Sequence, residues 1–171
     1  MKIRLTIFSC LFALSTLLFS GCGHGELIPP GMPKLYPATI TVTQDGKPLA
    51  GAGVIMINAD PSTSWSAGGN TDQNGVLKLK TMGRYPGAPV GKYIVAVQKI
   101  ETPNKKLPSE PSDPAELREY NRLVKEIADN TFSLVDKKFS LGVSELEVEI
   151  TPSNLNVSVD VSPAVREKAS L

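Results

Sequence analysis

The sequence predicts an all-β fold, a two-layer sandwich of seven strands with one helical insertion near 113–128. Several stretches alternate apolar and polar residues with the period of two that is typical of a half-buried strand. Asp45-Gly46 and Asp72–Gly75 are turn signals, because Asn, Asp and Gly tolerate the positive φ of tight turns. The chain also has 14 Gly and 14 Pro among 171 residues, and this frequency of turn-forming residues favours a β fold over a helical bundle.

Two of the predicted strands are apolar on both faces. Residues 52–58 contain the run Val-Ile-Met-Ile, which suggests a strand buried on both sides, and 91–98 have the pattern of a central strand in a two-layer fold. Near the C-terminus, 144–150 and 155–161 alternate strictly and are separated by a turn, which predicts a hairpin with one face on the core. The full set of predicted strands is 36–43, 52–58, 69–71, 75–80, 91–98, 144–150 and 155–161.

A helix is predicted inside the segment that interrupts the β pattern. Asp113 and Pro114 are suited to the N-cap and to the first helical position. A stripe of apolar residues follows at spacings of three, four and three: Leu117, Tyr120, Val124 and Ile127. This pattern predicts an amphipathic helix of about fifteen residues whose stripe packs on one sheet and closes the sandwich. The alternative is a docking helix for a partner, which requires the stripe to be exposed.

The first residues have the build of a bacterial secretion signal. Lys2 and Arg4 precede an apolar run of about fifteen residues, which is short of the roughly 20 that a membrane span needs. The run ends in Ser20-Gly21-Cys22, which resembles the lipobox of bacterial lipoproteins. That resemblance implies cleavage before Cys22 and attachment of lipid, including palmitate, to this cysteine. The alternative is an ordinary signal peptide with an incidental cysteine.

These features predict the organisation of the chain and its cellular location. We expect an exported protein that is anchored to a membrane through the lipid on Cys22. Gly23 favours the outer membrane over the inner one. His24, the only histidine, is expected to be solvated in the tether. The predicted parts are a signal peptide at 1–21, a flexible tether at 22–35, a sandwich domain at 36–162 with its helical insertion at 101–143, and a frayed C-terminal tail at 163–171.

Three runs of the sequence resemble a known family. They are DGKPLAGAGVIMI at 45–57, GNTDQNGVLKLKT at 69–81 and GAPVGKYIVAVQK at 87–99. Together they resemble small bacterial lipoproteins with a carboxypeptidase-regulatory-like domain, a member of the transthyretin-like β-sandwich group. The resemblance implies a transthyretin-like Greek-key sandwich. Nearly all of the matched residues are turn-forming or core residues, so the resemblance bears on the fold and not on a function.

The sequence argues against several functional classes. A formal net charge of +1 gives a nucleic-acid partner no electrostatic footprint. The transthyretin-like group includes a purine-pathway hydrolase that relies on histidines and on a Tyr-Arg-Gly-Ser tail, and this chain has only His24 and a different tail. Asn70–Gly75 matches the opening of a calcium loop, but the twelfth position is Thr81 where a bidentate Glu is needed, which favours a plain turn. We expect no metal and no cofactor.

The remaining prediction is a non-catalytic, lipid-anchored module of the cell envelope with a binding or structural role. Its contact would be a protein or a glycan, and Trp65 and Tyr85 are the candidate ligand contacts because aromatic rings in loops are common binding anchors. Their loops, 60–68 and 83–89, flank the same central strands, so we expect them to converge. Alternatively, Trp65 folds back over the end of the sandwich. The competing function is a hydrolase of the transthyretin-like group or an enzyme based on carboxylates, which requires two close, buried acids.

Overall fold

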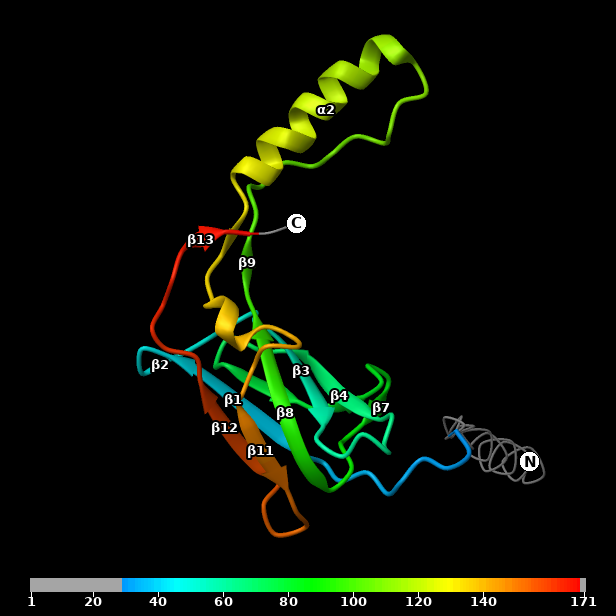
Figure 1. Cartoon of the computed structure of the whole chain (residues 1–171), viewed down its shortest axis with the longest axis vertical. Helices are drawn as coiled ribbons and strands as arrows, with labels where there is room; N and C mark the ends of the chain where they lie inside the picture. The colour runs from blue at the N-terminus through cyan, green and yellow to red at the C-terminus, as the bar shows by residue number, and fades with distance from the viewer. Residues whose placement is uncertain (1–28, 170–171) are drawn as a thin grey trace, which may run out of the picture. The chain divides into compact units, whose positions relative to one another are not determined.

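The structure is a computed structural model that describes residues 29–169 (Figure 1). The chain divides into a unit of residues 1–30 and a unit of residues 31–171, and the fold reported below is that of the second unit. It is an all-β sandwich of two main sheets, extended by a small third sheet and one α-helix. The predicted fold class is therefore confirmed.

The first main sheet is organised around β1 (Thr39–Gln44). One edge of β1 pairs in parallel with β12 (Asn156–Asp160). Its other edge pairs antiparallel with β2 (Lys47–Pro48) and with β5 (Val76–Lys78). The β-branched residues of β1 suit such a central position, because they pack well on a pleated surface.

The second main sheet has six strands in the order β11-β8-β3-β4-β6-β7, and every neighbouring pair in it is antiparallel. Its centre is the pairing of β3 with β8, which runs from Gly53 opposite Gln98 to Asn58 opposite Tyr93. The strands are β3 (Gly53–Asn58), β4 (Ser66–Asn70), β6 (Lys80–Thr81), β7 (Tyr85–Pro86), β8 (Gly91–Gln98) and β11 (Glu147–Ile150).

The hydrophobic core lies between these two sheets. The cross-strand pairs Val54–Val97 and Met56–Val95 of the second sheet are buried in it. Tyr93 is also fully buried, and its hydroxyl donates a hydrogen bond to the Pro89 carbonyl oxygen at 2.8 Å. Burial raises the pKa of this phenol, while a hydrogen bond with the Asn58 side chain acts in the opposite direction. From the first sheet, the buried residues include Ile40, Val42, Leu77, Val157 and Val159.

One predicted strand and one predicted hairpin are instead each divided between the two sheets. The predicted strand 75–80 is divided at Leu79, so β5 belongs to the first sheet and β6 to the second. The predicted C-terminal hairpin is wrong in the same way, because β11 pairs with β8 whereas β12 pairs with β1. The tight turn between them, Thr151–Asn154, is present and carries the chain from one sheet to the other. The alternation of apolar and polar residues shows which side of a strand faces the core. Because both sheets face the same core, it does not show which sheet the strand joins.

The third sheet has the order β13-β10-β9 and is built from β9 (Ile100–Glu101), β10 (Phe132–Ser133) and β13 (Glu167–Lys168). The Arg166 guanidinium lies over the Phe132 ring at 3.7 Å from its centroid, and its Nε donates to Glu101 Oε2 at 3.1 Å. The prediction of a frayed tail at 163–171 is therefore wrong for the residues that form β13. We call this third sheet the stem, because its strands β9 and β10 connect the sandwich to the helix (Figure 1).

The helix α2 (Pro114–Asp129) begins where the sequence predicts. The Asp113 carboxylate accepts a hydrogen bond from the Ala115 backbone N–H at 2.8 Å, and Pro114 occupies the first helical position. A short 3-10 helix, η1 (Lys137–Phe139), follows β10 and buries Phe139. Both helices are capped by an aspartate, as expected for a residue that satisfies free N–H groups at a helix start.

The predicted turns are confirmed in detail. Asp45 and Gly46 both have positive φ, at 52° and 72°. In the turn after β4, Asp72 Oδ1 accepts hydrogen bonds from the backbone N–H groups of Asn74 and Val76, at 2.8 and 2.9 Å. Gly75 closes this turn with φ of 71°. The Asp72 carboxylate is therefore engaged by the turn itself.

Two glycines with nearly the same φ give a matched test of this turn. A Cβ at Gly75 would lie 2.6 Å from the Val42 carbonyl oxygen and 2.9 Å from the Leu49 nitrogen, whereas a Cβ at Gly46 would meet nothing within 4 Å. Gly46→Ala should lower the free energy of unfolding by about 1–2 kcal/mol, the cost of a left-handed residue. Gly75→Ala should cost at least about twice as much, because backbone atoms must also move. Urea unfolding followed by Trp65 fluorescence measures both, and equal losses would contradict this packing.

Candidate functional surface on the six-stranded sheet

The outer face of the six-stranded sheet carries a group of exposed aliphatic side chains. Ile55 and Ile57 on β3 are 45% and 42% exposed, and Ile94 on β8 is also exposed. The register places Ile57 opposite Ile94 and Ile55 opposite Ala96, so these side chains lie side by side on one face. Leu141, in the loop after η1, is 55% exposed and borders the same face. We call the four exposed side chains Ile55, Ile57, Ile94 and Leu141, together with Ala96, which is in the same row but only 6% exposed, the outer face.

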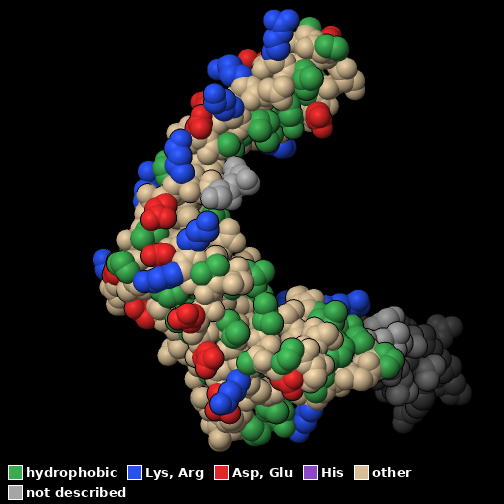
Figure 2. Space-filling view, viewed as in Figure 1, with side chains coloured by type: hydrophobic (Ala, Val, Ile, Leu, Met, Phe, Trp, Pro, Cys, Tyr) green, Lys and Arg blue, Asp and Glu red, His purple; other side chains and the backbone are tan. Residues whose placement is uncertain are grey.

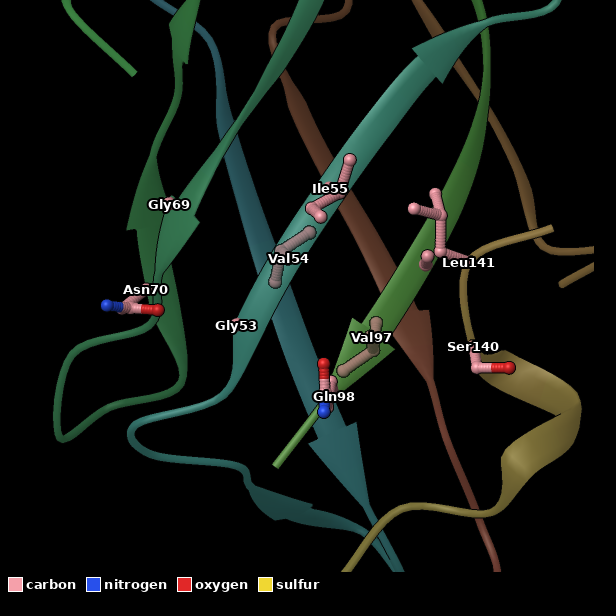
Figure 3. Close-up of a pocket in the computed structure, with 10 residues that line it drawn as sticks. Gly53, Val54, Ile55, Gly69, Asn70, Val97, Gln98, Ser140 and Leu141 are labelled. Carbon is pink, nitrogen blue, oxygen red and sulfur yellow. The ribbon is translucent and has the colours of Figure 1, made fainter. Parts of the chain in front are cut away.

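Two adjoining hollows make this face concave. One, of about 270 Å³, lies between β3, β4, the end of β8 and the loop at Ser140 and Leu141. The other, of about 140 Å³, is lined by Ile57, Ile94 and Leu141 among others. Figure 3 shows Ile55 and Leu141 bordering the larger hollow from different elements. Both hollows are lined mainly by apolar side chains, as binding surfaces for apolar groups usually are.

Strand β4 carries glycines beside the larger hollow: Gly69 lines it, and Gly68 is its neighbour in the strand. Gly68 lies opposite Ile55 in the pairing of β3 with β4. A Cβ at Gly68 would stand 2.2 Å from the Val54 carbonyl oxygen, so the close approach of the two backbones requires glycine. The outward side chains of β3 and β8 therefore have no counterpart at Gly68 of β4. The outer surface of the sheet is recessed at this position.

The charges beside the outer face differ between its two edges. Glu147 of β11 lies opposite Ile94, and Glu149 lies opposite Lys92, so acidic residues border the face on the β11 side. Lys80 of β6 lies opposite Gly68 on the other side. Among the described residues, Glu147 and Lys80 form no ion pair. The face thus has an acidic edge and a basic edge that are both available to a partner.

The predicted helix does not cover this face. None of the residues of α2 is buried, and Leu117 and Val124 are each 37% exposed. The prediction that the stripe of α2 packs on a sheet and closes the sandwich is therefore wrong. Figure 2 shows hydrophobic side chains gathered along one side of α2. The alternative prediction, a docking helix for a partner, requires an exposed apolar stripe, and α2 has one.

Several charged residues of α2 form ion pairs, and others do not; Asp129 pairs with Lys168 at 3.6 Å. Glu119 pairs with Arg122 at 2.6 Å, and Glu126 pairs with Lys105. These hydrogen-bonded cations lower the pKa of both carboxyl groups. Arg118 and Lys125, the two other basic residues of the helix, form no ion pair among the described residues.

The structure brings the two predicted aromatic loops together but does not expose both rings. The Met82 backbone N–H, one residue before the second loop, donates to the Ser66 carbonyl oxygen of the first loop at 2.9 Å, so the second loop begins beside the first. Tyr85, however, lies in β7 with only 9% of its surface exposed and with Arg84 beside its ring. The prediction of an exposed ring at Tyr85 is wrong. Trp65 is half-buried directly before β4, and its role as a ligand contact stays a prediction.

Other predicted chemistry has no geometric basis in residues 29–169. Within that range the buried polar side chains are three threonines and Ser144, and no Asp or Glu is buried, so the close buried acids of the enzyme alternative are not found there. No cluster of three His, Cys, Asp or Glu side chains in the same range is arranged to hold a metal ion. Cys22 and His24 lie outside the described residues.

Comparison of the chain with protein-family models, with curated proteins and with solved structures found no match. Within residues 29–169, no helix combines the length and apolar character needed to cross a bilayer. Residues 29–169 form an all-β sandwich with an apolar sheet face and an amphipathic helix that no described element covers.

The sequence pattern of two strands indicates the outer face, but it does not show whether the outward residues are covered. Residues 52–58 and 91–98 are apolar on both sides, a pattern that predicts burial on both sides. In the structure their inward residues fill the core, while their outward residues form the exposed face. An apolar pattern on both faces of a strand in a two-layer fold predicts either a covering element or a contact surface.

Proposed function

We propose that this chain is an exported, lipid-anchored and non-catalytic module of the bacterial cell envelope that binds protein through the outer face. The observation that carries the proposal is the concave aliphatic face itself. Contiguous apolar surface with a charged border is typical of protein contact sites. A glycan site usually presents aromatic rings, and none of the side chains that define the outer face is aromatic.

The anchoring part of the proposal is supported by the sequence. Lys2 and Arg4, the short apolar run and Ser20-Gly21-Cys22 resemble a lipoprotein signal, and Gly23 favours delivery to the outer membrane. The resemblance to carboxypeptidase-regulatory-like lipoproteins points to the same location. A β-sandwich is a rigid support for such a contact surface, since its strands hold the side chains in fixed register.

The anchoring is tested by metabolic labelling. In bacterial cells that make the full chain, radioactive palmitate should be incorporated into the wild-type protein, and Cys22→Ala should abolish the label and leave the protein out of the membrane fraction. A wild type without label, or a variant labelled to the same extent, would disprove lipid attachment at this position.

The contact surface is tested by photo-cross-linking in the same cells. A benzoylphenylalanine at position 57, on the outer face, should form a covalent adduct with a protein on irradiation. The matched control is position 158, which is exposed on β12 of the opposite sheet and should form little or none. Equal yields at the two positions, or no adduct at 57, would mean that the outer face is not a binding surface.

A further inference from the structure

The part of the chain that the structure describes has two apolar surfaces that nothing within it covers, the outer face of the six-stranded sheet and the stripe of α2. We propose that α2 of one copy packs on the outer face of a second copy, and that the second copy returns the same contact to the first. This identifies the partner of the surface assigned under Proposed function and rests on that assignment. The result is a symmetric dimer in which each copy contributes one helix and one face.

The dimensions of the two surfaces agree. The 16 residues of α2 span about 24 Å at 1.5 Å per residue. The eight residues of β8 span about 26 Å at 3.3 Å per residue. A helix lying along β3 and β8 therefore meets the outer face in the middle of its length, with Lys92 and Gln98 of β8 beyond the apolar residues at the two ends. The apolar stripe would supply Leu117 and Val124 to the hollow beside Ile55 and Leu141.

The charges of the two surfaces also agree. On the helix, Arg118 and Lys125 are seven residues apart and flank one side of the stripe. Glu119 and Glu126 flank the other side and are already paired with Arg122 and Lys105, so Arg118 and Lys125 are the charges that a partner can complement. On the sheet, the β11 edge carries Glu147 and the β6 edge carries Lys80. Only one of the two directions in which the helix can lie along the strands brings opposite charges together. Such complementarity fixes the orientation of a contact more than it raises affinity.

The stem explains why the helix of a second copy is the better occupant. Only Lys99 separates β8 from β9, and the Leu134 backbone N–H donates to the Lys99 carbonyl oxygen at 2.8 Å. Gln44 also donates to the Leu134 carbonyl oxygen at 2.9 Å, which ties β10 to the first sheet. These bonds and the contact of Arg166 with Phe132 fix the stem from which α2 starts, and no residue of α2 is buried against its own sandwich. The helix of another copy can reach the outer face without any change in the stem.

The expected area also favours a reciprocal contact. A stable interface buries about 1,200–2,000 Å² in total, and one helix about 24 Å long on a sheet supplies only part of this. Two equal contacts double the buried area. Anchoring of both copies to one membrane would raise their effective concentration and favour even a weak dimer.

Isotope-mixed cross-linking tests the proposal. Unlabelled full chain with benzoylphenylalanine at position 57 is mixed in detergent with ¹⁵N-labelled full chain that keeps Ile57, and the adducts are mapped by mass spectrometry. The proposal expects unlabelled peptides that contain position 57 joined to labelled peptides from residues 114–129. Adducts to these residues in unlabelled form alone would mean that α2 docks on its own sheet, and would overturn the dimer.

Two further outcomes separate this inference from the proposed function. If position 57 cross-links in cells only to a different protein, the dimer is wrong while the contact surface stands. If position 57 forms no adduct, both fail. Lipid attachment at Cys22 is measured independently of either result.

Charge reversal supplies a second test that does not depend on the cross-linker. Lys125→Glu should raise the dissociation constant of the dimer about tenfold in sedimentation velocity at low salt, and Glu147→Lys should do the same. The double variant should recover most of the loss. Lys106→Glu, an exposed lysine outside α2, is the control with the same change of charge and should have little effect. Equal effects of Lys125→Glu and Lys106→Glu, or no recovery in the double variant, would overturn the proposed contact.

Discussion

The pairing of β3 with β8 is the constraint on which the rest of the structure depends. Both strands are apolar on both faces, and their register places inward residues such as Val54 and Val97 together and outward residues such as Ile57 and Ile94 together. The inward set is covered by the sheet around β1. The outward set has no covering layer among the described residues. Exposing aliphatic surface to water costs free energy. A partner that buries these outward residues would therefore gain the most binding free energy at this site.

Local sequence signals predicted much of the fold because local physics determines it. The strand at 91–98 has the predicted bounds, and the Asp45-Gly46 turn and the Asp113 cap form as expected. In each case the outcome depends on residues within one turn or one strand, such as a positive φ or a side chain that satisfies a free N–H. These signals do not require knowledge of distant contacts.

The choice of sheet for each strand could not be predicted in this way. β11 and β12 alternate alike, yet they join different sheets, and Leu79 separates two strands that the pattern presents as one. The stem was missed because its strands have only two residues each and its contacts join positions far apart, such as Arg166 with Phe132 and Glu101. Loop aromatics gave a misleading signal for the site, since Tyr85 is a buried strand residue. The outer face was detectable only as an excess of apolar residues without a cover.

Amide hydrogen exchange in α2 as a function of protein concentration tests most directly whether the helix and the outer face meet between copies. A helix without buried residues should exchange rapidly when it is solvated. We expect the amides of residues 117–127 in the full chain to exchange at least about tenfold more slowly once the protein is concentrated well above the dissociation constant of the dimer. Exchange in α2 that is the same at every concentration, whether fast or slow, would contradict docking between copies.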